Sequence, residues 1–463
     1  MRTSLLLTTS LAAAVAACGG SNSGTPITCG TGTTLMDGMC VATGGSNTGD
    51  TCGAGTHLEG TTCVPDDTTV QVAPTVATID PPDAGISGYV LFTITGTGFA
   101  GSNVTDLHVF FGDPTNMSCE AQVGTATATT IAGEVPPGCS LSPQVTVTVT
   151  TNLGSATIPF HYDMVFAADG DGGGSFGQGG DLYVIDPFAQ LSFDLGALTD
   201  GTNGYGLGGM DFDATGTLYA VTTGDSPADL SGVSQLLLVD LSTGSVTSRG
   251  YTIDATYDYV VTDIKFAGGT LYGWAYFNDG NATQRTLVSI STTDGSVTAI
   301  GTPSQEDSLT GGLAVDSTGA LIAAVNGAAA DAQATYPMTG EVDTVNTADG
   351  TLTAAASLSW PVAAPIEAMT TLTVGTNSAI LAVVDNGFYG ATNFAEEYGE
   401  TLAVLDVSGE TLSPAFELPA QVGAQSHVDA LAVPPTTLVL ARQLPKVGWQ
   451  QLKASAGGHA LAR

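Results

Sequence analysis

The sequence predicts an all-β protein in which a β-sandwich precedes a ring of repeated four-stranded sheets. Short runs of alternating apolar and polar residues, divided by Gly, Asn, Asp and Pro, follow one another from residue 73 onward. From residue 163 one pattern returns several times, with at least two strand-like runs in each copy. A repeat of this kind is stronger evidence for the fold class than any single predicted strand.

The composition limits the class of protein and its partners. The chain has 463 residues, which exceeds a typical domain of about 100–200 residues, so we expect at least two folded units. Its 44 acidic residues against 8 Lys and Arg give a formal charge of −36. Such a charge repels phosphate backbones, which excludes a nucleic acid as partner.

Residues 1–18, MRTSLLLTTSLAAAVAAC, have the pattern of an export signal. Arg2 gives a short positive region, residues 5–15 are mostly apolar, and small residues precede Cys18. The last four residues, VAAC, resemble the lipobox of bacterial lipoproteins. The resemblance implies that Cys18 is lipidated and that acyl chains anchor the protein to the bacterial outer membrane or cell surface. A plain secretory signal with an incidental cysteine is the alternative.

The other six cysteines form an even set, as disulfides in an oxidising compartment require. CGTGTTLMDGMCV (29–41) and CGAGTHLEGTTCV (52–64) repeat at a spacing of 23 residues. Short loops close most readily, so the predicted pairs are Cys29–Cys40, Cys52–Cys63 and Cys119–Cys139. A zinc site is the rival for the first four, but CxxC spacing is absent. Residues 19–72 are rich in Gly, Thr and Ser, which predicts a flexible stalk around the two loops.

Residues 73–162 read as short strands separated by turn residues. The runs PTVATIDPP, GYVLFTITGTGF, VFFGD, VPPG and VTVTVTTNLGSATIPFHY resemble an IPT/TIG domain. The resemblance implies an immunoglobulin-like β-sandwich that acts as a spacer or an interaction module.

Residues 163–441 contain five versions of a two-strand unit, with partner strands between them. The five are GLGGMDFDATGTLYAVT (206–222), VVTDIKFAGGTLYGWAY (260–276), LTGGLAVDSTGALIAAV (309–325), PIEAMTTLTVGTNSAILAVV (365–384) and HVDALAVPPTTLVLA (427–441). Equivalent residues Met210, Ile264, Leu313, Met369 and Leu431 are 54, 49, 56 and 62 residues apart. This spacing suits propeller blades of four strands, so we expect a β-propeller of about five blades, and a strongly diverged repeat would raise the number to six or seven.

The two ends of this region complement each other. Residues 165–198 supply the later strands of a blade, whereas the last copy supplies only a first strand. Strands from both ends should therefore close the ring, which removes exposed sheet edges. The phrase GLAVDSTGALIAAV resembles NHL and SMP-30-like propellers. In SMP-30-like lactonases, acidic and amide residues lie at the mouth of the channel, and this chain lacks their full set.

The first strand of each blade should line the channel, with its starting end at a mouth. Alignment of the repeats places Gly208, Thr262, Gly311, Glu367 and Asp429 in one column and Gly209, Asp263 and Gly312 in the next. Asp263, Glu367 and Asp429 therefore predict a carboxylate group at this mouth, with His427 close by. Carboxylates in contact need a cation between them, and oxygen ligands favour Ca²⁺. The open alternative is that these groups accept hydrogen bonds from backbone amides.

Two further features bear on partners. Aromatic residues crowd the third blade and the stretch 386–398, where they either pack between blades or stack on sugar rings. Residues 442–463 form a basic tail, with four of the eight cations of the chain. The tail either docks on the acidic body or stays disordered, and contact with an anionic surface polymer is the other interpretation.

These observations predict a cell-surface lipoprotein that acts as a non-catalytic binding or adhesion module. Its propeller would present a face to a protein or glycan ligand. No GxSxG motif is present, and the five histidines are scattered along the chain, so no catalytic residue is assigned. The alternative is a calcium-dependent propeller hydrolase or lactonase. The sequence alone does not decide between binding and enzymatic activity.

Replacement of Cys18 by Ser tests the anchor. The thioether to lipid needs the thiol, so Cys18→Ser should remain unprocessed or soluble while the body folds normally. Detergent phase partitioning and mass spectrometry of the N-terminus measure this. Continued partitioning of a processed Cys18→Ser protein into detergent would contradict the lipoprotein interpretation.

Overall fold

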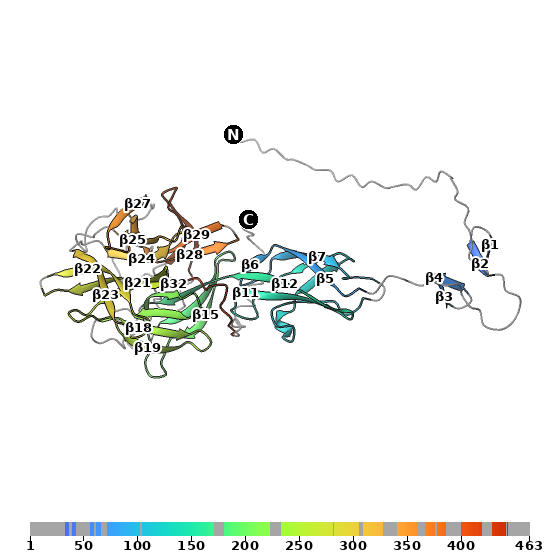
Figure 1. The fold of residues 1–463 in the computed structure, drawn as a ribbon, viewed down its shortest axis with the longest axis horizontal. Coiled ribbons are helices and arrows are strands. Elements are labelled where there is room, and N and C mark those ends of the chain that lie inside the picture. The colour runs from blue at the N-terminus through green and yellow to red at the C-terminus, as the bar shows by residue number, and fades with distance from the viewer. Residues whose placement is uncertain are drawn as a thin grey trace, which may run out of the picture. The chain divides into compact units, whose positions relative to one another are not determined.

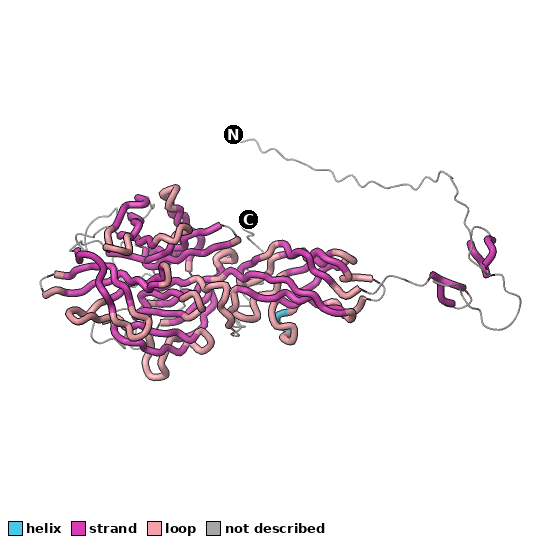
Figure 2. Tube along the Cα trace, in the orientation of Figure 1, coloured by secondary structure: helices cyan, strands magenta, loops and turns pink. Residues whose placement is uncertain are grey.

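The computed structural model describes two compact units, Met1–Gln71 and Val72–Arg463. The described residues are 33–36, 39–42, 56–59, 62–65, 72–101, 104–170, 180–222, 233–280, 282–304, 309–326, 340–358, 366–375, 377–385, 400–418, 428–440 and 442. Nearly every described element is a strand, apart from one turn of 3-10 helix, Met117–Cys119 (Figure 2). No helix in these ranges has the length and apolar character that a membrane crossing requires.

In the first unit the structure describes two antiparallel hairpins. They are β1 (Thr33–Met36) with β2 (Met39–Ala42), and β3 (Thr56–Glu59) with β4 (Thr62–Pro65). Corresponding strands start 23 residues apart, the spacing at which the two cysteine loops repeat. Cys40 lies in β2 and Cys63 in β4, whereas Cys29, Cys52 and Cys18 lie outside the described residues. The Cys29–Cys40 and Cys52–Cys63 pairings therefore stay predictions.

The second unit begins with a sandwich of two four-stranded sheets (Figure 1). In β11, Val145, Val147 and Val149 point inward while the intervening residues are more exposed, the pattern of a half-buried strand. The core between the sheets combines aliphatic and aromatic side chains, and Phe111 lies 4.8 Å from Phe160, centroid to centroid. One sheet is β5 (Thr75–Asp80), β7 (Leu91–Thr97), β10 (Thr130–Glu134) and β9 (Gln122–Ala126); the other is β6 (Asp83–Gly85), β12 (Gly154–Asp163), β11 (Gln144–Thr151) and β8 (His108–Phe111).

The predicted disulfide within the sandwich is confirmed. Cys119 and Cys139 are bonded to each other, and both side chains are buried. They pack with Phe110 as a small cluster beside the main core. The bridge fixes the segment after β8 to the segment that precedes β11.

Five further four-stranded sheets form a β-propeller, which confirms the predicted fold class and five blades (Figure 1). The equivalent residues Met210, Ile264, Leu313, Met369 and Leu431 are all fully buried. From the innermost strand outward, blade 1 is β32 (Val428–Ala432), β13 (Val165–Asp169), β14 (Asp181–Asp186) and β15 (Leu191–Ala197), and blade 2 is β16 (Leu207–Phe212), β17 (Leu218–Thr222), β18 (Gln235–Asp240) and β19 (Ser245–Tyr251). In the same order, blade 3 is β20 (Val260–Ala267), β21 (Thr270–Asn278), β22 (Thr283–Ile290) and β23 (Val297–Ser304), and blade 4 is β24 (Leu309–Val315), β25 (Leu321–Asn326), β26 (Gly340–Val345) and β27 (Leu352–Leu358). Blade 5 is β28 (Ile366–Val374), β29 (Asn377–Asp385), β30 (Glu400–Asp406) and β31 (Thr411–Glu417).

Blade 1 is built from both ends of the propeller region, as predicted. Strand β32 pairs antiparallel with β13, about 260 residues earlier in the chain, and becomes the innermost strand of that sheet. The inner strands then form a closed ring in the order β16, β20, β24, β28 and β32. Closure supplies blade 1 with its innermost strand, so that each of the five sheets has four strands.

Carboxylates build the tight turns between strands. Asp240, Asp349 and Asp406 each accept hydrogen bonds from a Ser or Thr hydroxyl and an amide two residues later. This is the Asx-turn chemistry of Asp-x-Ser/Thr sequences. The hydroxyl bond is the main cause that lowers the pKa of each of these three carboxyls. Part of the acidic excess therefore serves local turn geometry.

The sandwich and blade 1 share one continuous core. Strand β12 runs into β13 across Met164, which is buried, and Phe166 then contacts Phe212 of blade 2 at 5.6 Å between centroids. Asp186 of blade 1 accepts hydrogen bonds from the Ser87 amide at 2.9 Å and the Ser87 hydroxyl at 2.5 Å. The two domains are thus joined by apolar packing and by a buried polar contact.

Residues 433–440 and 442, which we call the strap, continue from β32 to the sandwich. The Leu440 amide donates to the Ser142 hydroxyl at 2.9 Å, and the Leu141 amide donates to the Arg442 carbonyl at 2.8 Å. The Arg442 guanidinium donates to the carbonyl of Leu241 at 2.7 Å and to that of Leu195. The sequence placed these residues in the last propeller strands and the basic tail. Arg442 docks on the body, which is one of the interpretations of the tail drawn from the sequence, and residues 443–463 lie outside the described residues.

Glycines allow the inner strands to touch. A β-carbon on Gly312 would lie 2.2 Å from the Met369 nitrogen of the next inner strand. Overpacking costs about 1–3 kcal/mol where neighbours can shift, and here the neighbour is backbone. We expect Gly312→Ala to lower the free energy of unfolding by about 3 kcal/mol, measured by denaturant titration and calorimetry.

Gly124→Ala is the matched control for this change. Gly124 also lies in a strand, and its added β-carbon would have its nearest neighbour at 3.6 Å, an ordinary contact. The expected change is within about 0.5 kcal/mol. Equal stability of the two variants would show that the inner ring tolerates wider spacing.

Candidate functional site

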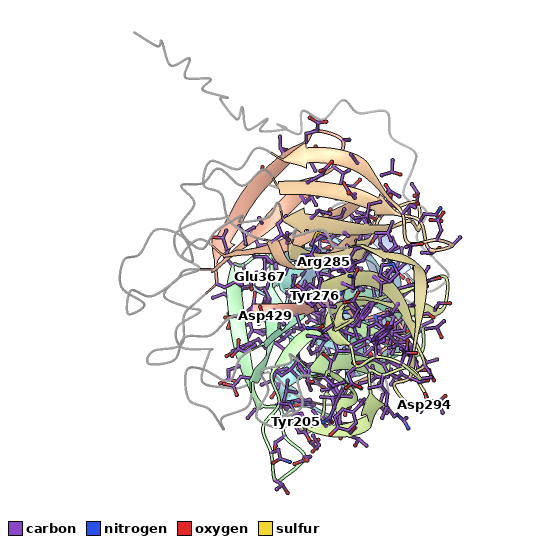
Figure 3. The ribbon with its side chains drawn as sticks, turned by 90° about the vertical axis from the view of Figure 1, so that its left-hand side faces the viewer. Tyr205, Tyr276, Arg285, Asp294, Glu367 and Asp429 are labelled. Atoms are coloured by element: carbon purple, nitrogen blue, oxygen red, sulfur yellow. A yellow bond between two sulfur atoms is a disulfide. The ribbon has the colours of Figure 1, made fainter. Side chains whose placement is uncertain are left out.

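The two ends of the propeller channel are different. The inner strands all run in the same direction, so their C-terminal ends, which we call the finishing ends, lie at one end of the channel. Residues at these ends, including Phe266, Val315 and Leu372, line a cavity together with Pro143 and Tyr162 of the sandwich. The sandwich therefore covers the finishing end. The starting ends of the inner strands lie at the opposite face, which we call the mouth (Figure 3).

Each inner strand carries a β-bulge near its start. The register of every inner strand with its neighbour shifts there, so that one or two residues leave the ladder. Bulges re-aim side chains and are frequent next to functional sites. The residues skipped by the pairing are Gly208, Thr262, Gly311 with Gly312, Glu367 and Asp429. The first column aligned in the sequence is therefore the bulge position of all five blades.

Glu367 and Asp429 are both half-buried at the mouth and lie on the same side of the ring in Figure 3. Asp429 lies against the backbone of Gly170, where a β-carbon would come within 1.5 Å of its Oδ2. Glycine at 170 is thus required for this placement. Thr262 uses its hydroxyl to donate to the Trp274 carbonyl at 3.2 Å.

Asp263 is placed differently, because it follows the bulge and its side chain is only 1% exposed. Its Oδ1 accepts from the Ile264 amide at 2.7 Å, and its Oδ2 accepts from the Leu313 amide of the next inner strand at 2.5 Å. Burial raises the pKa of Asp263 to about 7, although Lys265 and the two amides act in the opposite direction. Asp263 therefore joins blade 3 to blade 4.

The predicted cation group does not form among the described residues. In these ranges, no three His, Cys, Asp or Glu side chains gather closely enough to hold a metal ion. The reason is the direction of Asp263, which satisfies backbone amides instead of meeting Glu367 and Asp429. For Asp263 this is the alternative that the sequence left open. His427 lies outside the described residues.

Sequence reasoning missed the buried charges at the channel axis. Lys265 is 2% exposed, and its Nζ donates to the Met210 carbonyl at 2.9 Å and to the Leu431 carbonyl at 2.7 Å. Asp211 Oδ2 accepts from the Phe266 amide at 2.7 Å, while its Oδ1 is 3.9 Å from Lys265 Nζ. Burial raises the pKa of Asp211, and Lys265 opposes the shift. The available signal was a lysine inside an apolar strand of a chain with eight cations in total.

The described aromatic residues of blade 3 serve mainly to pack. Tyr257 and Tyr259 contact Phe277 at 4.4 and 5.1 Å between centroids, in a cluster that includes Val221 of blade 2. This is packing between blades, one of the two interpretations given by the sequence. The stretch 386–398 lies outside the described residues.

Comparison with known proteins supports the sandwich assignment. Residues 74–162 match the family model described as IPT/TIG domain. None of the curated proteins matches the chain. The sandwich is therefore an Ig-like domain of the IPT/TIG type, while the propeller is defined here by its own five sheets.

Several solved structures are similar in fold at low identity. A Bacteroides thetaiotaomicron protein of unknown function is 13% identical, with a TM-score of 0.30, and the match covers 81% of this chain and 92% of that one. A candidate gluconolactonase is 14% identical, with a TM-score of 0.31 and coverage of 56% and 82%. A Hadza microbial sialidase is 11% identical, with a TM-score of 0.33 and coverage of 72% and 87%. These similarities carry no argument about activity.

The raised pKa of Asp263 predicts a pH-dependent stability. Between pH 4 and 7 the unfolded chain has released this proton, whereas the folded protein keeps it until about pH 7. The free energy of unfolding should therefore fall as pH rises through this window, by up to about 1.4 kcal/mol per pH unit from this group, and then level off. Asp263→Asn should show a smaller slope, measured by urea unfolding at several pH values from 5 to 8.

Asp294→Asn serves as the control for this experiment. Hydrogen bonds from Ser291 and Ser296 lower the pKa of the exposed Asp294 carboxyl, so it is ionised throughout the range tested. This variant should keep the wild-type slope. A slope in Asp263→Asn as steep as that of the wild type would show that Asp263 is ionised in the folded protein.

Proposed function

We propose that this protein is a lipid-anchored, non-catalytic binding protein of the bacterial cell surface that presents the mouth of its propeller to a protein or glycan ligand. The observation that carries the proposal is the coverage of the channel end opposite the mouth by the IPT/TIG sandwich. A domain that occupies the finishing end leaves the starting end as the propeller face turned toward other molecules.

The direction of the sandwich supports this arrangement. Its first residues, Ala73 and Pro74, lie beside Gly154 at the start of β12. The ten residues of β12 then lead to blade 1, a distance of about 30 Å for an extended strand. The chain thus enters the sandwich at the end remote from the propeller. The segment N-terminal to Val72 is therefore attached at this end of the sandwich.

The chemistry of the mouth favours binding through hydrogen bonds. Glu367 and Asp429 supply carboxylate acceptors from two blades whose bulges take them out of the strand ladder. Acceptors of this kind suit the hydroxyls of a glycan or the basic groups of a protein. The overall charge of −36 favours a neutral or cationic partner.

The hydrolase alternative has less support from the described residues. It requires an oxygen cluster for calcium, and Asp263 already uses both oxygens to hold two backbone amides. Recruitment of Asp263 by a metal would break the contact between blades 3 and 4.

The double variant Glu367→Gln, Asp429→Asn tests the mouth. We would screen the full lipoprotein against a glycan array and purified surface proteins, and then measure the affinity of each hit. Loss of two charge-assisted contacts should weaken binding about tenfold or more, without loss of the fold by circular dichroism.

The matched control is Glu410→Gln, Asp294→Asn, which changes the same charges away from the mouth. Both residues are exposed in turns between the outer strands, and Asp294 lies at the rim in Figure 3. This control should bind as the wild type does. Equal binding by all three proteins, or calcium-dependent turnover of lactones or esters lost only in the mouth variant, would overturn the proposal.

A further inference from the structure

The covered end of the channel contains a cavity of about 300 Å³. Its propeller wall receives residues from every blade: Asp211, Lys265, Val315 and Thr370 lie on four inner strands, and Val433 directly follows the fifth. The cavity therefore lies on the propeller axis. At about 30 Å³ per water in the liquid, its volume corresponds to about ten waters.

The axial wall offers one donor and one acceptor that the protein does not join directly. A lysine ammonium has three N–H donors, and two of those on Lys265 are bound to the carbonyls of Met210 and Leu431. The 3.9 Å between Lys265 Nζ and Asp211 Oδ1 is too long for a hydrogen bond. An oxygen placed about 2.8 Å from each atom would accept from Lys265 and donate to Asp211, which is the bonding of a hydroxyl group.

The remaining lining fits the body of such a ligand. Tyr162, Phe266 and Pro434 provide apolar surface, whereas the buried Thr370 adds a polar side chain. Thr373 and Thr436 also line the cavity and are exposed, so the cavity reaches solvent at these threonines.

We propose that this cavity is a second binding site, independent of the mouth, for a neutral sugar whose hydroxyl bridges Lys265 and Asp211. The opposite charges of these two residues balance, so the wall does not select for an anion. A pyranose presents hydroxyls on its edge and C–H groups on its faces, which match the paired charges and the apolar lining. The location between two domains is a common one for small-molecule sites.

The test measures binding of glucose, galactose, mannose and arabinose to the full protein, by saturation-transfer NMR and calorimetry, with glucuronate as the anionic comparison. Thr436→Trp places a large side chain at the solvent side of the cavity and should weaken sugar binding at least tenfold. Val439→Trp is the control on the same strap, because Val439 is 84% exposed and does not line the cavity. It should bind as the wild type does.

Asp211→Asn provides a second variant at the axis, and it should also weaken binding of the neutral sugars. The mouth variant Glu367→Gln, Asp429→Asn should leave this binding unchanged, which separates this site from the proposed function. Absence of binding by all four sugars would show a water-filled structural cavity and overturn the proposal. Stronger binding of glucuronate, or full binding by Thr436→Trp, would overturn it as well.

Discussion

Closure of the ring of five inner strands is the constraint on which the rest of the structure depends. Strand β32 must return to pair with β13, and the inner strands must then approach closely enough to touch. Gly312 permits this contact on one side of the ring. Lys265 connects three inner strands near the axis, because its ammonium group on β20 donates to a carbonyl of β16 and to a carbonyl of β32. A buried charge is costly unless its donors are satisfied, so the register of these three strands is tightly fixed.

The asymmetry of the molecule follows from that closure. Because blade 1 combines the first and last strands of the propeller, the sandwich and the strap meet on the same side of the ring. The strap then adds polar contacts between Ser142 and Leu440, and Arg442 binds carbonyls of blades 1 and 2. Apolar packing through Met164 alone would allow some rotation between the domains. Contacts at several separate points oppose it, so the mouth keeps a defined direction relative to the sandwich.

Much of the fold could be predicted because its signals are local. Alternating strands divided by turn residues mark each blade, and the incomplete sheets at the two ends predict the closure. The aligned column coincides with the bulges, which the sequence analysis did not predict, because the same backbone feature recurs in every repeat. The direction of Asp263 could not be predicted, because it depends on how β20 approaches β24 across the ring. Lys265 was missed for a similar reason, and the sequence did not give the partners of Arg442. Both side chains bind backbone carbonyls, which every residue carries and no sequence motif marks.

The distribution of charge shows where a ligand is best sought in such an acidic protein. Many aspartates, such as Asp240 and Asp406, accept hydrogen bonds from amides and hydroxyls within their own turns. A high acidic content is therefore weak support for a metal site, and the absence of a three-carboxylate group among the described residues agrees with this. Where opposite charges stand apart at a cavity wall, as Lys265 and Asp211 do, hydrogen-bonding capacity remains for another molecule. The cavity proposed as a sugar site lies on the propeller axis, because residues from all five blades converge there.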